Sequence, residues 1–186
     1  MAANISLILG GAWSGKTSRA ALVAAQSTDV TWIGTASETV PELAEHIHAL
    51  RSERPPHWHH IAAPFELSKA LISVANSAGN GLIVVDSISQ WLSNEIARHA
   101  ARHDDEQIKK ILTRDVEDLC EIFVGTLKHR HLLLVSSDFG QSPPPQDSHQ
   151  RILRMIVGTT NTKLAALAQR VEIVTAGLVV FAKDIK

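Results

Sequence analysis

The 186-residue chain is 45% hydrophobic and carries a formal net charge of −1, which indicates one globular domain over residues 1–186 and excludes a disordered or fibrous chain. Its 18 basic residues balance 19 acidic residues, so the composition gives no sign of a nucleic-acid partner. A single cysteine and the short apolar run at residues 5–9 predict a reduced cytoplasmic protein with neither a disulfide nor a membrane span.

Short apolar runs alternate with helical patterns along the chain. The first runs are residues 5–9 and 30–34, and a helix is expected to begin near Lys16 between them. The runs at 82–86 and 132–135 contain almost no polar residues, which predicts fully buried strands. Near the end of the chain, two further runs flank Gly177 and indicate a hairpin or a kinked pair of strands.

The longest helical pattern covers residues 104–129, where apolar side chains recur at spacings of three and four. Cys120 lies on this apolar stripe, which predicts an inert core thiol. Three consecutive prolines at 143–145 predict a surface loop, whose role the sequence leaves open. Buried strands alternating with helices predict an α/β fold with a mostly parallel sheet and helices on both faces.

Residues 10–17 read GGAWSGKT and match the pattern G-x-x-x-x-G-K-[ST] of a phosphate-binding loop, the P-loop. Glycines let backbone N–H groups turn toward phosphate oxygens, and the following helix points its positive end at the same anion. Lys16 is expected to reach the β- and γ-phosphates, and the Thr17 hydroxyl to hold Mg²⁺. The predicted nucleotide-binding residues are Gly10, Gly11, Ala12, Trp13, Ser14, Gly15, Lys16 and Thr17.

Asp86 ends the most apolar predicted strand, where P-loop enzymes place a carboxylate near the metal. A simpler alternative is that Asp86 caps the next helix, with Ser87 or Ser89 sharing that role. On the first interpretation, Thr17 and Asp86 are the Mg²⁺ ligands, Lys16 and Asp86 are catalytic, and GTP or ATP is the substrate nucleotide. The residues alone thus predict nucleotide-dependent phosphoryl transfer or a nucleotide-driven switch.

Several segments outside the P-loop resemble one family, in order and over nearly the whole chain. Residues 32–36 resemble its Y-I-A-T strand end, and residues 47–58 resemble its R-I-x-x-H-x-x-x-R-P…W segment. Residues 85–94 resemble its D-C-L-T-x-W-L-x-N motif, and residues 134–186 resemble its C-terminal third. The chain therefore resembles the bifunctional adenosylcobinamide kinase / adenosylcobinamide-phosphate guanylyltransferase family of cobalamin biosynthesis.

This resemblance implies a RecA-like P-loop NTPase fold, a homo-oligomer (a trimer in the family) and two activities. The kinase activity phosphorylates the aminopropanol hydroxyl of adenosylcobinamide with a nucleoside triphosphate. The second activity transfers GMP from GTP to that phosphate through a guanylylated histidine, which is nucleophilic catalysis. By resemblance, further binding residues are Thr35, Ala36 and Ser37 in the nucleotide cleft and Arg51 and Arg54 near phosphate, while Asp138 is a candidate for orienting the substrate hydroxyl.

The sequence departs from the family at functional positions. The nucleophilic histidine falls on Leu50, which cannot attack a phosphate, and the acidic residue that follows the tryptophan falls on Ala62. His48 is the candidate for a shifted nucleophile, although on a helix it points about 200° away from Leu50.

Another departure replaces the loop arginine with Trp13, which is expected to stack on a base or corrin edge, or to cover a neighbouring subunit. We expect a cobinamide kinase with lost or impaired guanylyl transfer. The alternatives are a divergent nucleotide-binding paralogue without corrinoid catalysis and a small-molecule kinase of unrelated substrate.

Overall fold

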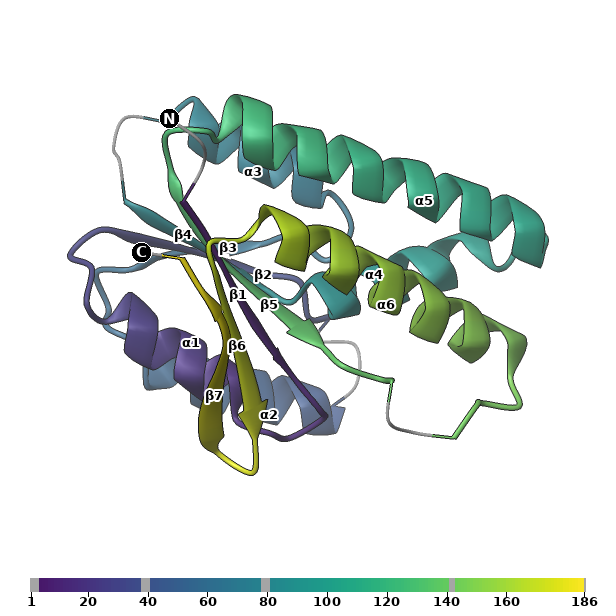
Figure 1. Cartoon of the computed structure of the whole chain (residues 1–186), viewed down its shortest axis with the longest axis horizontal. Coiled ribbons are helices and arrows are strands. Elements are labelled where there is room, and N and C mark those ends of the chain that lie inside the picture. Colours follow the sequence, from purple (N-terminus) through teal and green to yellow (C-terminus); the bar gives the residue numbers. More distant parts are fainter. Residues whose placement is uncertain (1–3, 38–40, 78–80, 141–142, 186) are drawn as a thin grey trace.

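The computed structural model describes residues 4–37, 41–77, 81–140 and 143–185, apart from the side chains of residues 41–43 and 46. Strands and helices alternate along most of the chain (Figure 1). The strands are β1 (Asn4–Gly10), β2 (Val30–Gly34), β3 (His59–Ala62), β4 (Leu82–Asp86), β5 (His131–Ser137), β6 (Arg170–Thr175) and β7 (Leu178–Asp184). The helices are α1 (Lys16–Ala24), α2 (Pro41–Ser52), α3 (Leu67–Ala75), α4 (Ile88–His99), α5 (Asp105–Glu121) and α6 (Ser148–Leu167).

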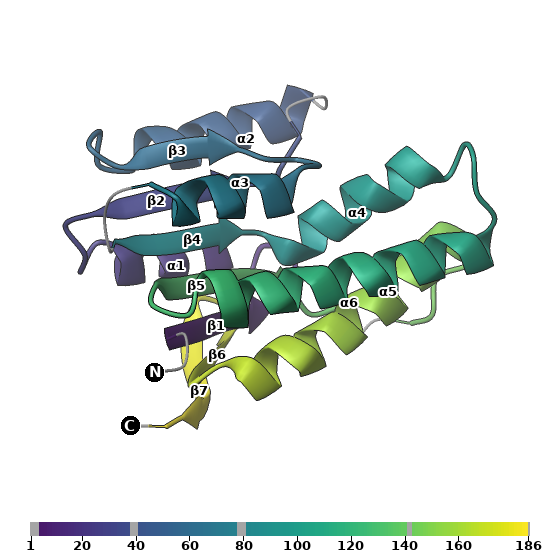
Figure 2. The ribbon, with the colours of Figure 1, turned by 90° about the horizontal axis from the view of Figure 1, so that it is seen from above.

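The seven strands form one sheet in the order β3-β2-β4-β5-β1-β6-β7, which can be followed across Figure 2. Neighbouring strands are parallel except β6 and β7, which form the antiparallel hairpin expected around Gly177. The predicted mostly parallel α/β sheet is therefore confirmed. Because β1 lies between β5 and β6, its last residue, Gly10, is held from both sides.

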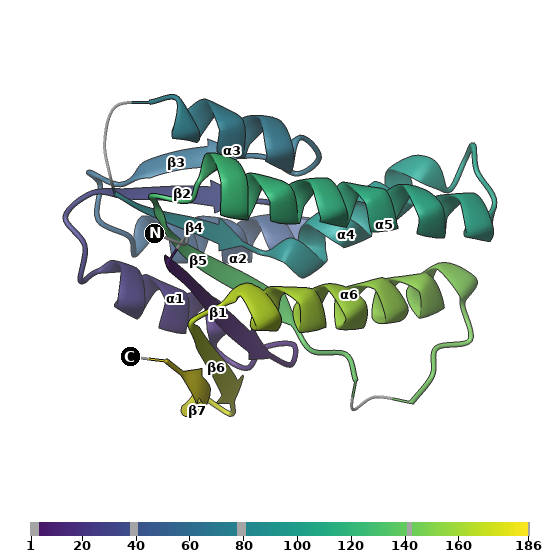
Figure 3. The same ribbon diagram turned by 45° about the horizontal axis from the view of Figure 1, so that its top comes forward.

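Helices cover both faces of the sheet, as predicted (Figures 1 and 3). On one face α3, α4, α5 and α6 pack over a large apolar core, to which β1, β4 and β5 contribute Leu7, Val85 and Leu134. On the other face α1 covers a smaller core around Ile8 and Trp32. When both faces of a strand are covered by helices, the side chains that point to either face are apolar, which is why the sequences of these strands are continuous apolar runs.

The helix predicted over residues 104–129 is shorter than expected. Asp104 caps it through a reciprocal capping box with Gln107, and α5 ends at Glu121. A π-helical turn, Ile122–Thr126, follows, in which the Leu127 N–H donates to the Ile122 carbonyl. Gly125 disfavours the α-helical path here, and the wider turn still buries Phe123.

Two further expectations concern burial and the membrane. Cys120 packs against the large core, and burial raises the pKa of its thiol, as expected for an unreactive side chain.

Within the described ranges, the helices lack the combination of length and apolar composition needed to cross a lipid bilayer.

Candidate active site

The P-loop leaves β1 at the carboxyl edge of the sheet and enters α1 at Lys16. A side chain at Gly10 is impossible, because its Cβ would lie 2.3 Å from the Val174 carbonyl oxygen of β6. Gly15 has a φ of 95°, the left-handed conformation that favours glycine. The Gly177 N–H in the β6–β7 turn donates to the Ser14 carbonyl at 3.0 Å. The C-terminal hairpin therefore supports the loop directly.

The loop combines several features that favour the binding of an anion. The N-terminus of α1 has no side-chain cap, so its backbone N–H groups remain for a ligand. The Lys16 ammonium donates to the Gly11 carbonyl at 2.7 Å, and burial lowers its pKa. The buried Ser14 hydroxyl has no hydrogen-bond partner within the described residues. These groups border a cavity of about 550 Å³, whose lining is residues 12–18, Leu50 and Gln90.

Asp86 lies beside this loop, at the end of β4. The Thr17 hydroxyl donates to its Oδ1 at 3.3 Å, and the Arg54 guanidinium lies 3.8 Å from its Oδ2. Burial raises the pKa of the Asp86 carboxyl, while these neighbours and Lys16 oppose the rise. The helix cap is Ser87, whose hydroxyl accepts from the Gln90 N–H, so the capping alternative for Asp86 is wrong.

The oxygens of Thr17 and Asp86 fit a magnesium site. Mg²⁺ takes hard oxygen ligands, and it is usually held by one or two carboxylates together with water and substrate phosphates. Among the described residues no cluster of three or more His, Cys, Asp or Glu side chains could hold a metal ion. A cation here would therefore depend on the phosphates of a bound nucleotide.

Arg54 places its guanidinium over the ring of Trp32 in β2. Its guanidinium lies 3.7 Å from the ring centroid of Trp32, which stacks on Trp58 at 5.9 Å between centroids. Burial lowers the pKa of Arg54, and the nearby Asp86 carboxylate opposes this. Spacing along the chain gives no hint of the contact between Arg54 and Trp32, because the whole of α2 lies between the two residues in sequence.

The other predicted cleft residues separate into two groups. Thr35 is fully buried, and its hydroxyl donates to the Ser87 carbonyl at 2.7 Å and accepts from the Ser87 N–H at 2.8 Å. Its side chain therefore holds the peptide that follows Asp86 and does not line the cleft. Ala36 and Arg51 line a smaller cavity of about 200 Å³ together with Arg54. Ser37 is half-buried and directly follows Ala36.

The structure places Leu50, and not His48, at the P-loop cavity. Leu50 is half-buried and lines the cavity, whereas His48 is exposed and is not among its lining residues. Asp138 follows β5, and its N–H donates to the Gly10 carbonyl at 2.9 Å. Its carboxylate accepts from the Gly140 N–H at 2.8 Å and borders a cavity of about 460 Å³ under the proline loop.

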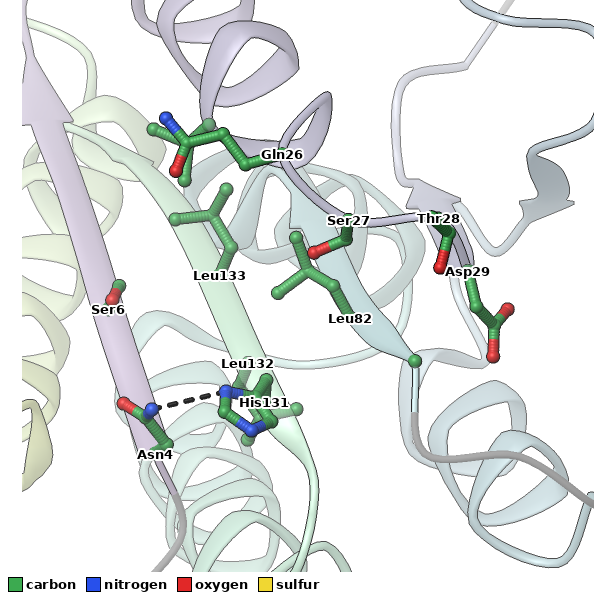
Figure 4. A pocket seen from close by; sticks show the side chains of 12 residues that line it. Asn4, Ser6, Gln26, Ser27, Thr28, Asp29, Leu82, His131, Leu132 and Leu133 are labelled. Atoms are coloured by element: carbon green, nitrogen blue, oxygen red, sulfur yellow. Dashed lines mark hydrogen bonds between the residues drawn. The ribbon is translucent and has the colours of Figure 1, made fainter.

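A further cavity of about 580 Å³ lies at the opposite, amino edge of the sheet (Figure 4). Its lining includes the starts of β1, β4 and β5 and the segment after α1, and Asn4 contacts His131 at 3.1 Å. Open α/β sheets bind their ligands outside the carboxyl ends of the strands. The candidate active site is therefore the P-loop cavity.

Comparisons with known proteins agree with this geometry. Residues 6–181 match the CobU family, described as cobinamide kinase / cobinamide phosphate guanyltransferase. The bifunctional adenosylcobalamin biosynthesis protein CobP of Pseudomonas aeruginosa is 35% identical over 92% of this chain and 93% of its own length. The bifunctional adenosylcobalamin biosynthesis protein CobU of Salmonella typhimurium is 27% identical over 92% of this chain and 96% of its own length.

Solved structures show the same fold at low identity. The ATPase EscN of the enteropathogenic E. coli type III secretion system aligns with a TM-score of 0.59 at 12% identity, over 93% of this chain and 42% of EscN. The chain thus spans less than half of that ATPase. The Pyrococcus horikoshii protein PH0250 aligns with a TM-score of 0.53 at 9% identity, over 98% of this chain and 87% of that protein. The expected RecA-like P-loop fold is confirmed.

Proposed function

The chain belongs to the CobU family of cobinamide kinase / cobinamide phosphate guanyltransferase, and on this premise we propose that it is a Mg²⁺-dependent adenosylcobinamide kinase. The observation that carries the proposal is that Lys16 and Thr17 line one cavity at the carboxyl edge of the sheet, with the Asp86 carboxylate accepting a hydrogen bond from Thr17. ATP or GTP would supply the phosphoryl group.

In this proposal the chain acts by positioning and by neutralising charge. The backbone N–H groups of the loop and the Lys16 ammonium hold the β- and γ-phosphates. Thr17 and Asp86 would hold Mg²⁺, which would neutralise charge on the phosphate oxygens. The acceptor hydroxyl, oriented by Asp138, forms a bond to the γ-phosphorus and passes its proton to the Asp138 carboxylate, while the bond from that phosphorus to the bridging β,γ-oxygen breaks. The nucleoside diphosphate leaves.

Guanylyl transfer is proposed to be lost or strongly impaired. Leu50 takes the nucleophile position and lines the P-loop cavity, but its side chain has no nitrogen to carry GMP. The relocated nucleophile, His48, would need a rotation or a shift of α2 to reach the same cavity. The alternative is a nucleotide-binding paralogue without corrinoid catalysis. The observation that favours it is that the mouth of the cavity carries Trp13 and Leu50 instead of arginine and histidine.

The remaining features are proposed from the family and the surface. We propose one domain over residues 1–186, a cytoplasmic location and a homo-oligomer, a trimer by resemblance. The edge strand β7 supports an association between subunits, because it exposes Leu178 and Val180 to 72% and 59%. Exposed apolar side chains on an unpaired edge favour pairing with another chain.

A kinase assay tests the main proposal. Purified protein is incubated with adenosylcobinamide, Mg²⁺ and γ-³²P-labelled ATP or GTP, and labelled corrinoid is expected. Lys16→Ala is expected to lower the rate at least about 100-fold. Leu22→Ala is the matched control, because Leu22 lies on the same helix, is 66% exposed and does not line the cavity. Nucleotide binding without labelled corrinoid would favour the paralogue.

A second assay tests the missing nucleophile. The protein is incubated with Mg²⁺ and α-³²P-GTP, denatured, and examined for acid-labile label on the chain. The wild type is expected to carry no label, and Leu50→His is expected to gain it. Label on the wild type that disappears in His48→Ala would show a relocated nucleophile and restore the bifunctional activity.

A further inference from the structure

Two departures from the family motifs meet in one cavity. Trp13 comes from the P-loop and Leu50 from α2, and both line the cavity of about 550 Å³ above Lys16 and Thr17. The loop arginine of the family would stand at the first position and its histidine at the second. Both changes replace a charged or titratable side chain with a more apolar one, so Trp13 and Leu50 add apolar surface to a cavity that Ser14, Lys16 and Thr17 also line.

Trp13 is presented to solvent in an unusual way. Its side chain is 84% exposed, whereas Trp32, Trp58 and Trp91 are all buried. Its backbone φ is 57°, a left-handed conformation that a bulky residue adopts only at an energetic cost. An exposed indole on a binding loop presents a flat apolar surface.

The position of Lys16 indicates which substrate meets this face. The Lys16 ammonium lies 2.7 Å from the Gly11 carbonyl, in the first half of the loop, and the P-loop lysine serves the β- and γ-phosphates. Trp13 lies two residues after Gly11 and lines the same cavity as Lys16, so in the proposed nucleotide complex it is placed near the terminal phosphate. The group that approaches the terminal phosphate is the phosphoryl acceptor, whereas the base lies at the far end of the nucleotide.

We propose that Trp13 and Leu50 form an acceptor patch that binds an apolar face of a planar macrocycle and brings its side-chain hydroxyl over Lys16. The identification of that macrocycle as the corrin ring rests on the proposed kinase function. A flat conjugated ring stacks well on an indole, and the leucine side chain adds apolar contact without a competing positive charge. In this proposal, replacing the family's arginine and histidine by Trp13 and Leu50 removes the nucleophile for guanylyl transfer and provides a binding surface for the acceptor.

The test is equilibrium dialysis of cobinamide, whose visible absorbance reports binding independently of tryptophan. Trp13→Ala is expected to raise the dissociation constant for cobinamide about tenfold, and Trp13→Phe by less than about threefold. Both variants keep the backbone N–H groups through which the P-loop is expected to hold phosphate, so the dissociation constant for ATP or GTP is expected to change by less than about twofold. Leu22→Ala, at an exposed leucine outside the cavity, serves as the control and should match the wild type for both ligands.

The other possible results would each contradict the acceptor patch, and they distinguish its failure from a failure of the proposed kinase function. Phosphorylation of the corrinoid with unchanged cobinamide affinity in Trp13→Ala would overturn the patch and leave the kinase function standing. A loss of nucleotide affinity instead would assign Trp13 to the base. If the wild type neither binds nor phosphorylates cobinamide, both the function and the patch are wrong. Thermal unfolding of the two Trp13 variants verifies that each is folded.

Discussion

Replacing Asn94 tests how the motif at residues 85–94 supports the active site. The buried Asn94 amide nitrogen donates to the Thr35 and Pro64 carbonyls, each at 2.8 Å, and its oxygen accepts from Gln90 at 3.0 Å. It therefore ties α4 to the ends of β2 and β3. Thr35 in turn holds the Ser87 peptide beside Asp86. The asparagine of this motif has a structural role in the site.

Asn94→Ala is expected to lower the free energy of unfolding by about 3 kcal/mol. A buried carbonyl left without a donor costs about 1–3 kcal/mol. Thr35 is fully buried, whereas Pro64 is half-buried and open to water, so we assign about 2 kcal/mol to the first and about 1 kcal/mol to the second. For a chain of this size the loss corresponds to roughly 6–12 °C in Tm.

Asn94→Asp adds a pH dependence that a simple loss of packing would not show. A carboxylate facing two carbonyl oxygens is repelled, so its folded pKa should rise above the unfolded value of about 3.9. The resulting destabilisation is present above the folded pKa and disappears below the unfolded one. Urea unfolding at several pH values measures both variants, with Ser93→Ala as control. A loss below about 1 kcal/mol in Asn94→Ala, or a pH-independent deficit in Asn94→Asp, would refute this role.

Three further predictions concern buried charges. Burial raises the pKa of Glu95 from 4.5 to about 6, so the stability of the wild type should fall as the pH rises through this range. Glu95→Gln should therefore be more stable than the wild type by about 2 kcal/mol at pH 7 and equally stable below pH 4.5. Equal urea midpoints at pH 7 would contradict this prediction. Glu172→Ala removes a buried carboxylate that Arg19 and Arg170 contact at 2.7–3.0 Å, and the side chains of these arginines are 25% and 41% exposed. Because both guanidinium groups can turn to water when the carboxylate is removed, thermal unfolding should show a loss of stability of about 2 kcal/mol, less than the 3–5 kcal/mol of a fully buried pair. Arg54→Lys keeps the charge but loses the flat contact with Trp32, at a cost of about 1 kcal/mol, and an unchanged midpoint of unfolding would rule out that stacking.

Much of the fold could be predicted from the sequence because of how its strands are buried. The runs at 30–34 and 82–86 coincide with β2 and β4 residue for residue, since strands covered on both faces contain hardly any polar residues. The P-loop was recognisable because its chemistry depends on neighbours in sequence. The helix over 104–129 was overestimated, because apolar spacing does not distinguish an α-helix from a π-helical turn that keeps the same side chains buried.

The parts of the site that depend on distant residues could not be predicted. Arg54 meets both Asp86 and Trp32 only because β2 and β4 are neighbours in the sheet and α2 returns the chain beside them. The approach of Leu50 to the P-loop depends in the same way on the path of α2. Thr35 was predicted in the cleft by resemblance, but its hydroxyl is occupied by the Ser87 peptide.

The neighbours of β1 set the order in which the molecule can be completed during synthesis. Gly10 pairs with Ser137 on one side and Val174 on the other, and the loop beyond it is held by Gly177. The phosphate motif therefore leaves the ribosome well before β5 and the β6–β7 hairpin, which support it. Pairings so distant in sequence form late and leave edges exposed meanwhile. A nascent chain that ends before β6 carries the whole motif but lacks the strand and the turn that hold it, so we expect the phosphate site to form only after the β6–β7 hairpin has been synthesised.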